Sequence, residues 1–291
     1  MVCDWLVANS IPRSGDELPL PSSKARERSR LGGLFGPAMI VLALAAIGGL
    51  FGCEPKLVVG TRTRTCSADA AVEETSDPVV VPWSSSFENQ FCDYAPPTGY
   101  CYTAPLASYR TVTSPVHSGT HAAAFTVDSA DPASQQTRCV RQGTLPHAAY
   151  YGAWYFIPAT ATNADLWNLI HIMKTDPVPE PGLWDVSLEN GSDGDLRLVV
   201  YDHLSATKRR PATPVPVPIG AWFHIQFYLV RAAGPTGEVA LYQDGELLFD
   251  QTNIVTDDSS VGQWYVGNLA TDLTPSESTL YVDDVSISAT L

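Results

Sequence analysis

The chain has 291 residues, of which 45% are hydrophobic and 10% aromatic, and its formal net charge is −14. This length suffices for one large or two small domains, and an all-β sandwich often uses about 200–250 residues as a single domain. A chain this acidic has no electrostatic footprint for nucleic acid, so nucleic-acid binding is excluded as an expected function.

A basic patch followed by an uncharged apolar run lies near the beginning of the chain. Four basic residues stand between positions 24 and 30, and residues 31–52 contain no charge. This is the anatomy of a secretory signal, and the Gly52-Cys53 junction resembles the lipobox of bacterial lipoproteins. We therefore expect residues 1–52 to be a leader, Cys53 to be lipidated, and the lipid to anchor the chain in a bacterial outer membrane or at the cell surface. An uncleaved membrane-spanning anchor is the alternative, since 22 uncharged residues are long enough to cross a bilayer.

Residues 53–82 have no helical or strand period, and their small, acidic and Pro/Val-rich segments indicate a flexible tether. Beyond Cys53 the chain contains Cys66, Cys92, Cys101 and Cys139. An even number of cysteines in an exported chain favours two disulfides. Cys92 and Cys101 flank a Pro-Pro-Thr-Gly turn and are expected to pair, which leaves Cys66 for Cys139. Free buried thiols are the alternative.

From residue 83 onward, short apolar runs alternate with Gly, Pro, Asn and Asp clusters at intervals of about ten residues, which is typical of an all-β domain. No long stretch keeps the 3.6-residue period of an amphipathic helix. In chain order, the strands are expected at residues 150–157, 166–173, 183–189, 195–201, 221–231, 238–249 and 279–288. The run at 238–249 reads as a hairpin because Asp244-Gly245 is a favoured turn dipeptide.

The expected strands show the faces that a sandwich requires. In residues 221–231 the apolar side chains of Phe223, Ile225, Phe227 and Leu229 share one face. The runs at 150–157 and 166–173 are apolar on both faces, as in central strands covered by two layers. Two antiparallel sheets packed face to face satisfy this pattern. We expect residues 83–291 to form one all-β sandwich domain, and the chain to be a monomer.

Three stretches of this domain resemble a known fold family. They are Phe-Glu-Asn at 87–89 with Ser-Gly-Thr-His at 118–121, the aromatic run at 150–158, and the segment from 219 to 225 that leads into the Asp-Gly hairpin. Together they resemble the concanavalin A-like jelly rolls, and within them the polysaccharide lyase and laminin-G-like branches. The resemblance implies a jelly roll with a ligand groove on its concave sheet. It does not specify an activity, because the fold hosts lectins, hydrolases, lyases and adhesion domains.

The lyases of this family have an Arg, a Gln-x-His pair, and a Tyr near a late Lys-x-Gly segment. The cation or amide neutralises a uronate carboxylate, and a His or Tyr then takes the C5 proton. His171 matches the histidine of this pattern, but Leu169 occupies the glutamine position and Val266 the lysine position. No tyrosine stands at the family's spacing after Gly267. A lyase reading would use His171 with Tyr228 or Tyr201.

The arginine of such a lyase would be Arg138, Arg141 or Arg197, and Arg141 with His171 and Tyr228 forms the catalytic set that the resemblance implies. A glycosidase is less favoured, because Asp185 and Glu189 are four residues apart on one strand. That spacing is about 13 Å, which is too long for a pair of catalytic carboxylates.

Binding without catalysis is the function that the sequence favours. Aromatic faces stack on sugar rings, while amide, imidazole and guanidinium groups bond to hydroxyls. The residues expected to line a polysaccharide-binding face are Arg138, Arg197, Tyr201, His224, Gln226 and Tyr228. A polysaccharide lyase is the first alternative, and an adhesion or scaffold domain without a sugar site is the second.

A structural calcium ion is a further expectation. Carbohydrate-binding jelly rolls hold such an ion between an opening Phe-Glu segment and a closing Asp-Asp strand, which implies Glu88 and Asp284 as ligands here. Calcium prefers hard oxygen ligands. Gln90 stands where the family has glycine, and the alternative is that these carboxylates face solvent or cap turns.

Overall fold

The computed structural model describes residues 76–291, apart from 131–133, 176–181, 258 and 260. The expected leader, Cys53, Cys66 and most of the expected tether lie outside the described residues. Within the described part, no helix is long and apolar enough to span a membrane.

Strands make up almost all of the regular structure in the described chain. They are β1 (Trp83–Ser85), β2 (Gly99–Thr103), β3 (Ala107–Val112), β4 (Ala122–Asp128), β5 (Gln135–Gly143), β6 (Ala148–Phe156), β7 (Thr162–Lys174), β8 (Gly182–Asn190), β9 (Leu196–Asp202), β10 (Thr207–Arg209), β11 (Trp222–Val230), β12 (Gly237–Gln243), β13 (Glu246–Ile254), β14 (Gly262–Thr274) and β15 (Glu277–Ser288). A short 3₁₀ helix, η1 (Cys92–Tyr94), lies between β1 and β2.

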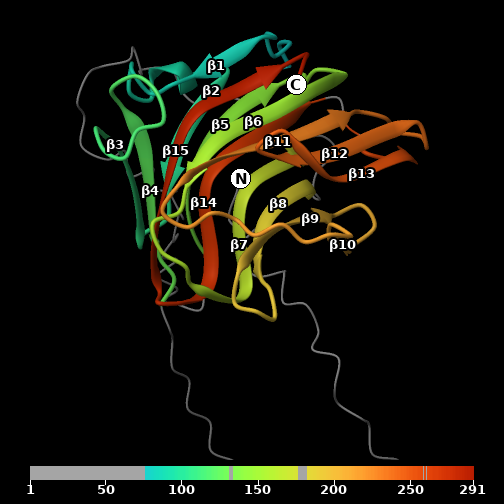
Figure 1. The fold of residues 1–291 in the computed structure, drawn as a ribbon. Helices are drawn as coiled ribbons and strands as arrows, with labels where there is room; N and C mark the ends of the chain where they lie inside the picture. Colours follow the sequence, from blue (N-terminus) through green and yellow to red (C-terminus); the bar gives the residue numbers. More distant parts are fainter. Residues whose placement is uncertain (1–75, 131–133, 176–181, 258, 260) are drawn as a thin grey trace, which may run out of the picture. The chain divides into compact units, whose positions relative to one another are not determined.

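These strands form two antiparallel sheets (Figure 1). One has the order β13-β12-β11-β6-β15-β4-β3, and β1 also pairs with β15. The other has the order β10-β9-β8-β7-β14-β5-β2. We call the first the eight-stranded sheet and the second the seven-stranded sheet, counting the strands of the described residues. The expected antiparallel sandwich is confirmed.

The core lies between the two sheets and follows the expected alternation. Phe223, Ile225, Phe227 and Leu229 of β11 are all fully buried. The ring of Phe227 lies 6.1 Å from that of Trp184 on the other sheet. Since successive strand residues point to opposite faces, the side chains between these core positions lie on the outer face of each sheet.

The seven segments expected from the sequence contain strands, with bounds that differ by a few residues. β14 and the strands of the first part of the domain were not predicted individually. Packing of the domain also begins before β1. Val79 is buried, and its backbone N–H donates to the carbonyl of Thr144 at 3.0 Å.

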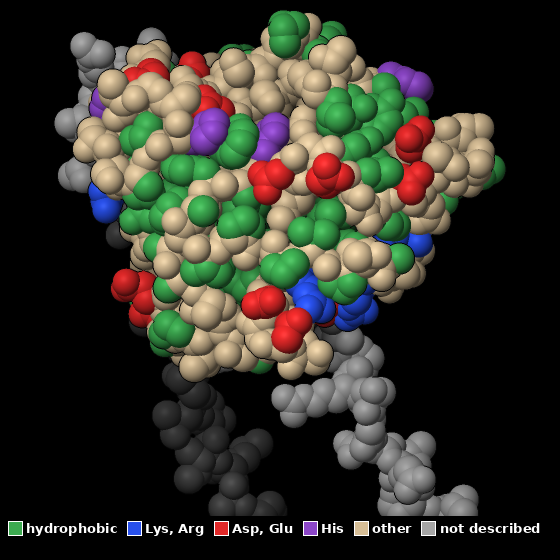
Figure 2. Space-filling model, in the orientation of Figure 1, with side chains coloured by type: hydrophobic (Ala, Val, Ile, Leu, Met, Phe, Trp, Pro, Cys, Tyr) green, Lys and Arg blue, Asp and Glu red, His purple; other side chains and the backbone are tan. Residues whose placement is uncertain are grey.

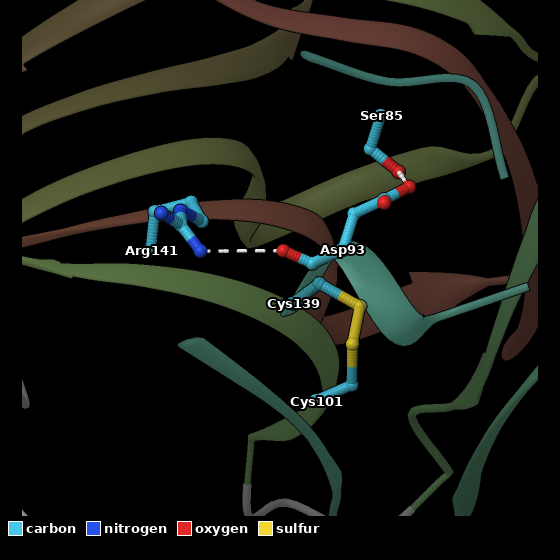
Figure 3. The surroundings of a disulfide bond; sticks show 5 residues. All are labelled: Ser85, Asp93, Cys101, Cys139 and Arg141. Carbon is cyan, nitrogen blue, oxygen red and sulfur yellow. Dashed lines mark hydrogen bonds between the residues drawn. A yellow bond between two sulfur atoms is a disulfide. The ribbon is translucent and has the colours of Figure 1, made fainter. Parts of the chain in front are cut away.

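The disulfide pairing differs from the expectation. Cys101 bonds Cys139, and the predicted Cys92–Cys101 and Cys66–Cys139 pairs are therefore wrong (Figure 3). Cys101 and Cys139 are directly opposite each other on the neighbouring strands β2 and β5. The prediction used nearness in sequence, whereas strand register decides which cysteines meet.

Candidate active site on the seven-stranded sheet

One row of side chains crosses all seven strands of this sheet on its outer face. The residues that the register places opposite one another are Tyr100, Val140, Tyr265, His171, Asp185, Tyr201 and Lys208. Opposed residues of antiparallel neighbours share a face and lie within contact range. The row therefore brings a phenol, an imidazole and a carboxylate together from three central strands.

A β-bulge in β7 adds an amide beside this row. The register with β8 shifts between Asn168 and Ile170, and Leu169 and Ile170 both belong to the hydrophobic core. Two consecutive residues face the core only where a strand bulges. The bulge puts Asn168 on the outer face together with His171, three residues later. In a regular strand, residues three apart point to opposite faces.

Asn168 binds the guanidinium of Arg138. Arg138 Nη2 donates to Asn168 Oδ1 at 2.8 Å, although their strands β5 and β7 are separated by β14. Gly267 of β14 stands opposite Arg138, and a Cβ at Gly267 would come within 2.9 Å of the Arg138 Cα, so this position needs a glycine where the two strands approach. The Arg138 guanidinium carbon also lies 5.6 Å from the centroid of the Tyr265 ring.

His171 is held by a buried carboxylate. His171 Nδ1 lies 2.5 Å from Asp185 Oδ1, and His203 Nε2 lies 2.9 Å from Asp185 Oδ2. Burial by itself raises the pKa of Asp185, but the two histidines outweigh it and hold that pKa well below its usual range. An ionised carboxylate only accepts hydrogen bonds. Both imidazole nitrogens that face it therefore carry hydrogen, and Nε2 of a neutral His171 is the acceptor.

Burial gives His171 and Tyr265 opposite acid–base properties. It lowers the pKa of His171 despite the opposing effect of Asp185, and it raises the pKa of Tyr265 well above the usual value. The two rings lie 5.2 Å apart. Near neutral pH the site therefore holds a neutral imidazole next to a protonated phenol, which is the combination needed for a base and an acid.

Arg141 does not belong to this site. It points to the core side of β5, where its guanidinium donates to the backbone carbonyl of Asp93 at 3.2 Å (Figure 3) and lies 4.7 Å from the centroid of the Trp83 ring. In β5 only every second residue shares a face. Arg138 and Arg141, three residues apart, therefore point to opposite sides, and the catalytic assignment to Arg141 is wrong.

The expected ligand-binding residues divide between two sheets. Arg138 and Tyr201 lie on the outer face of the seven-stranded sheet. His224, Gln226 and Tyr228 lie on the outer face of the eight-stranded sheet, where the ring of His224 stacks 4.9 Å from that of Trp154. Tyr228 consequently does not meet His171, and the expected set does not form one continuous surface.

Arg197 lies toward the far end of β8 and β9. It pairs with Asp193 and stands opposite Glu189. Glu189, Arg197 and Arg210 line an open pocket of about 380 Å³, which does not include His171 or Asp185. Arg197 therefore lies four residues along β9 from Tyr201, which is the β9 member of the row that contains His171.

The two expected calcium ligands bind one loop. The carboxylate of Glu88 accepts hydrogen bonds from the backbone N–H groups of Thr120 and His121 at 2.6 and 2.8 Å, while Asp284 accepts one from the hydroxyl of Ser118 at 2.9 Å. These contacts fasten the segment before β4 and need no ion. The calcium site stays a prediction, which a Ca²⁺-dependent thermal midpoint that is lost in Glu88→Gln would confirm.

Sequence reasoning missed four residues of the site, namely Asn168, Asp185, His203 and Tyr265. Asp185 was considered only as a glycosidase carboxylate. Tyr265 comes two residues before Gly267, whereas the family pattern has its tyrosine after the glycine. Asn168 was hidden by the bulge. The sequence signal for Asn168 is a polar residue three positions before His171, which shares its face if the strand contains a one-residue bulge.

Comparison with protein-family models and with curated proteins finds no match. Solved structures do match. The chain is similar to an endo-β-1,4-glucuronan lyase from the fungus Trichoderma reesei, with a TM-score of 0.54 and 17% identity over 67% of this chain and 92% of that one. It is also similar to the cellulose-induced protein Cip1, with a TM-score of 0.51 and 14% identity over 71% and 97% of the two chains. At these identities the likeness shows the fold alone, and the expected jelly-roll fold of two antiparallel sheets is confirmed.

Proposed function

We propose that this protein is a polysaccharide lyase that cleaves a uronate-containing polymer by β-elimination. The observation that supports this best is the meeting of Arg138, His171 and Tyr265 on one sheet face, with the bond from Arg138 to Asn168. β-Elimination needs a carboxylate neutraliser, a base and an acid around one point. The binding function that the sequence favoured needs no such combination.

Each of these side chains would have one role in the reaction. Arg138 would bind the uronate carboxylate and stabilise the negative charge that develops when the C5 proton leaves. His171 Nε2 would take that proton, and the electron pair would form the C4–C5 double bond. As the bond from C4 to the glycosidic oxygen breaks, the Tyr265 hydroxyl would protonate the leaving oxygen.

The surroundings of these groups support the assignment. Arg138, Tyr265 and Asn168 are nearly buried, while the His171 side chain keeps 15% of its surface accessible. Charge–charge interactions are stronger in a site with little water. The arginine is therefore well placed to act on a carboxylate, and the imidazole remains accessible from solvent.

The test is to incubate the full-length chain with glucuronan, alginate, pectate and heparin and to follow the ultraviolet absorbance of unsaturated uronates. We expect absorbance to rise with at least one polymer. Removal of a general acid or base typically costs about 10²–10⁴-fold in rate, so His171→Gln and Tyr265→Phe should each lower turnover by that amount.

His147→Gln is the matched control, because His147 is an exposed histidine outside the site. It should retain full turnover. If the wild-type chain produces no absorbance from any polymer, the lyase proposal is wrong. Retention of a polymer without elimination would then favour the binding function.

We also propose that the protein works outside the cell, attached through a lipid at Cys53. The charge-free run before this cysteine supports export, and the Cys101–Cys139 disulfide suits an oxidising compartment. Labelling cells with a radioactive fatty acid tests the proposal. The wild-type protein should take up label and Cys53→Ser should not, and label on both proteins would contradict it.

A further inference from the structure

The side chains of His171, Asp185 and His203 form a compact set of metal-ligating groups. Each offers one ligand atom, and these three atoms lie within 4.8 Å of one another. Two imidazoles and a carboxylate are a ligand set that suits zinc and other first-row transition metals, whereas calcium and magnesium prefer oxygen alone. We propose that these residues bind a Zn²⁺ ion and that the ion switches off the proposed lyase.

The present spacing is close to what zinc requires. Histidine nitrogens and carboxylate oxygens bind zinc at roughly 2.0–2.2 Å, so two ligands of one tetrahedral ion lie about 3.4 Å apart. The contacts of Asp185 with His171 and His203 are 2.5 and 2.9 Å. These contacts are to Oδ1 and Oδ2 of Asp185, respectively. Lengthening them by about 0.5–0.9 Å toward the zinc spacing, with rotation of the imidazoles and of the carboxylate, would let one atom of each residue surround one ion. Solvent water would complete the coordination.

The surrounding structure holds the imidazoles near these positions. The ring of Tyr201 lies 4.7 Å from that of His203, and the ring of Tyr265 lies 5.2 Å from that of His171. Gly182 lies next to the His203 ring, since a Cβ at Gly182 would come within 2.6 Å of Nδ1. The His203 side chain is 24% accessible, so an ion can approach from solvent.

Zinc and catalysis would compete for the same imidazole. Without metal, the Nδ1 hydrogen of His171 bonds Asp185 and leaves Nε2 free to accept a proton. A zinc ion takes the place of that hydrogen, because a metal-bound nitrogen of neutral imidazole cannot also bear hydrogen. The hydrogen then resides on Nε2. His171 would remain neutral but could no longer take the C5 proton.

The binding test needs no substrate. A tag-free full-length chain is treated with EDTA, exchanged into metal-free buffer and titrated with ZnCl₂ in a calorimeter. We expect saturable binding to the wild type, equal binding to His147→Gln, and at least tenfold weaker binding to His203→Gln. Gly182→Ala, which crowds His203 without removing a ligand atom, should also weaken binding. MgCl₂ should give no saturable binding.

Inhibition is tested separately and rests on the proposed function. Zinc should suppress turnover of the wild type, EDTA should restore it, and His203→Gln should keep a larger fraction of its own metal-free turnover at the same zinc concentration. Absence of zinc binding, or equal binding by His203→Gln, would overturn the metal site. Acceleration by zinc would overturn the inhibitory role. If no polymer is cleaved but binding depends on His203, the lyase proposal fails and the metal site stands.

Discussion

Arg138 is the cation that the proposed reaction depends on. Its guanidinium makes a hydrogen bond to Asn168 and lies over the ring of Tyr265. Lysine retains the charge but lacks the planar group that binds a carboxylate through two parallel hydrogen bonds. A side chain that must satisfy Asn168 and a substrate carboxylate at once therefore has to be arginine.

We expect Arg138→Lys to lower kcat/KM by about 10²–10³-fold, which is the usual cost of losing one preorganised stabiliser of transition-state charge. Initial rates of double-bond formation over a range of polymer concentrations measure this loss. Arg110→Lys, an exposed change on the eight-stranded sheet, should leave kcat/KM unchanged. A fall of less than threefold in Arg138→Lys would show that another group neutralises the carboxylate.

Asp185 acts through His171 and is a positioning residue. Its carboxylate fixes the hydrogen on Nδ1, and its charge raises the pKa of His171 against the lowering effect of burial. Asp185→Asn should therefore have two effects. Turnover falls because the imidazole is no longer held in one tautomer, and the pKa of His171 falls further because the stabilising negative charge is gone.

The pH dependence of kcat/KM, measured with EDTA present, separates these effects. The base is active only when neutral, so activity is lost as pH falls through the pKa of His171. In the wild type this loss of activity at acidic pH should lie below the ordinary histidine pKa of 6.5. In Asp185→Asn it should lie at still lower pH. An unchanged pH for this loss would mean that Asp185 has only a structural role.

At the scale of the strands, bulges decide what the site contains. β7 and β14 both shift register with their neighbours near the site. The shift in β7 brings Asn168 onto the outer face, while the pairing of β14 with β5 stays regular and keeps Gly267 opposite Arg138. Bulges near active sites commonly redirect a side chain in this way. Regular strands with the same residues would turn the amide of Asn168 toward the core.

The disulfide between β2 and β5 holds the edge strand β2 in place beside the site. Tyr102 of β2 bonds Gln136 of β5 at 2.9 Å, and its ring contacts that of Tyr265 at 6.4 Å. Cys101 and Cys139 are 38 positions apart. For a loop of this length the chain-entropy model gives about 4 kcal/mol of stabilisation, near the upper end of the usual range of about 2–4 kcal/mol.

We therefore expect the double variant Cys101→Ala/Cys139→Ala to lose about 2–4 kcal/mol in its free energy of unfolding. Urea denaturation of the variant and the wild type gives the difference. The double change is preferable to either single change, because a lone thiol is free to attack the disulfide bond of Cys92. A loss below about 1 kcal/mol would indicate that the strand pairing alone holds β2 in place.

For the whole molecule, periodicity predicted the sandwich but not the composition of its site. Strands such as β11 are readable because Phe223, Ile225 and Phe227 alternate with more polar residues. In β5, Thr137 and Arg141 face the core side while Val140 lies on the outer face. The polarity of a side chain in this strand therefore does not indicate the face of the sheet on which it lies. Strand order and register also decide that His171 meets Tyr265 and not Tyr228, and no local pattern contains that information.

Net charge governs how the molecule meets a charged polymer. The chain has a formal charge of −14, and Figure 2 shows Asp and Glu side chains scattered over one face, with the Lys and Arg side chains gathered in a few places. A polyuronate is itself anionic, so the two repel at long range. The contact with Arg138 is made in a nearly buried site, where salt screens much less.

These two effects predict an unusual salt dependence. Raising NaCl from about 10 mM to about 150 mM shortens the screening length from about 30 to about 8 Å, which should suppress the repulsion and leave the local contact largely intact. The apparent KM for a long polyuronate should therefore fall while kcat stays constant. A short oligosaccharide with few charges should show a smaller change. If KM instead rises with salt, a local positive field around the site outweighs the net charge and attracts the polymer.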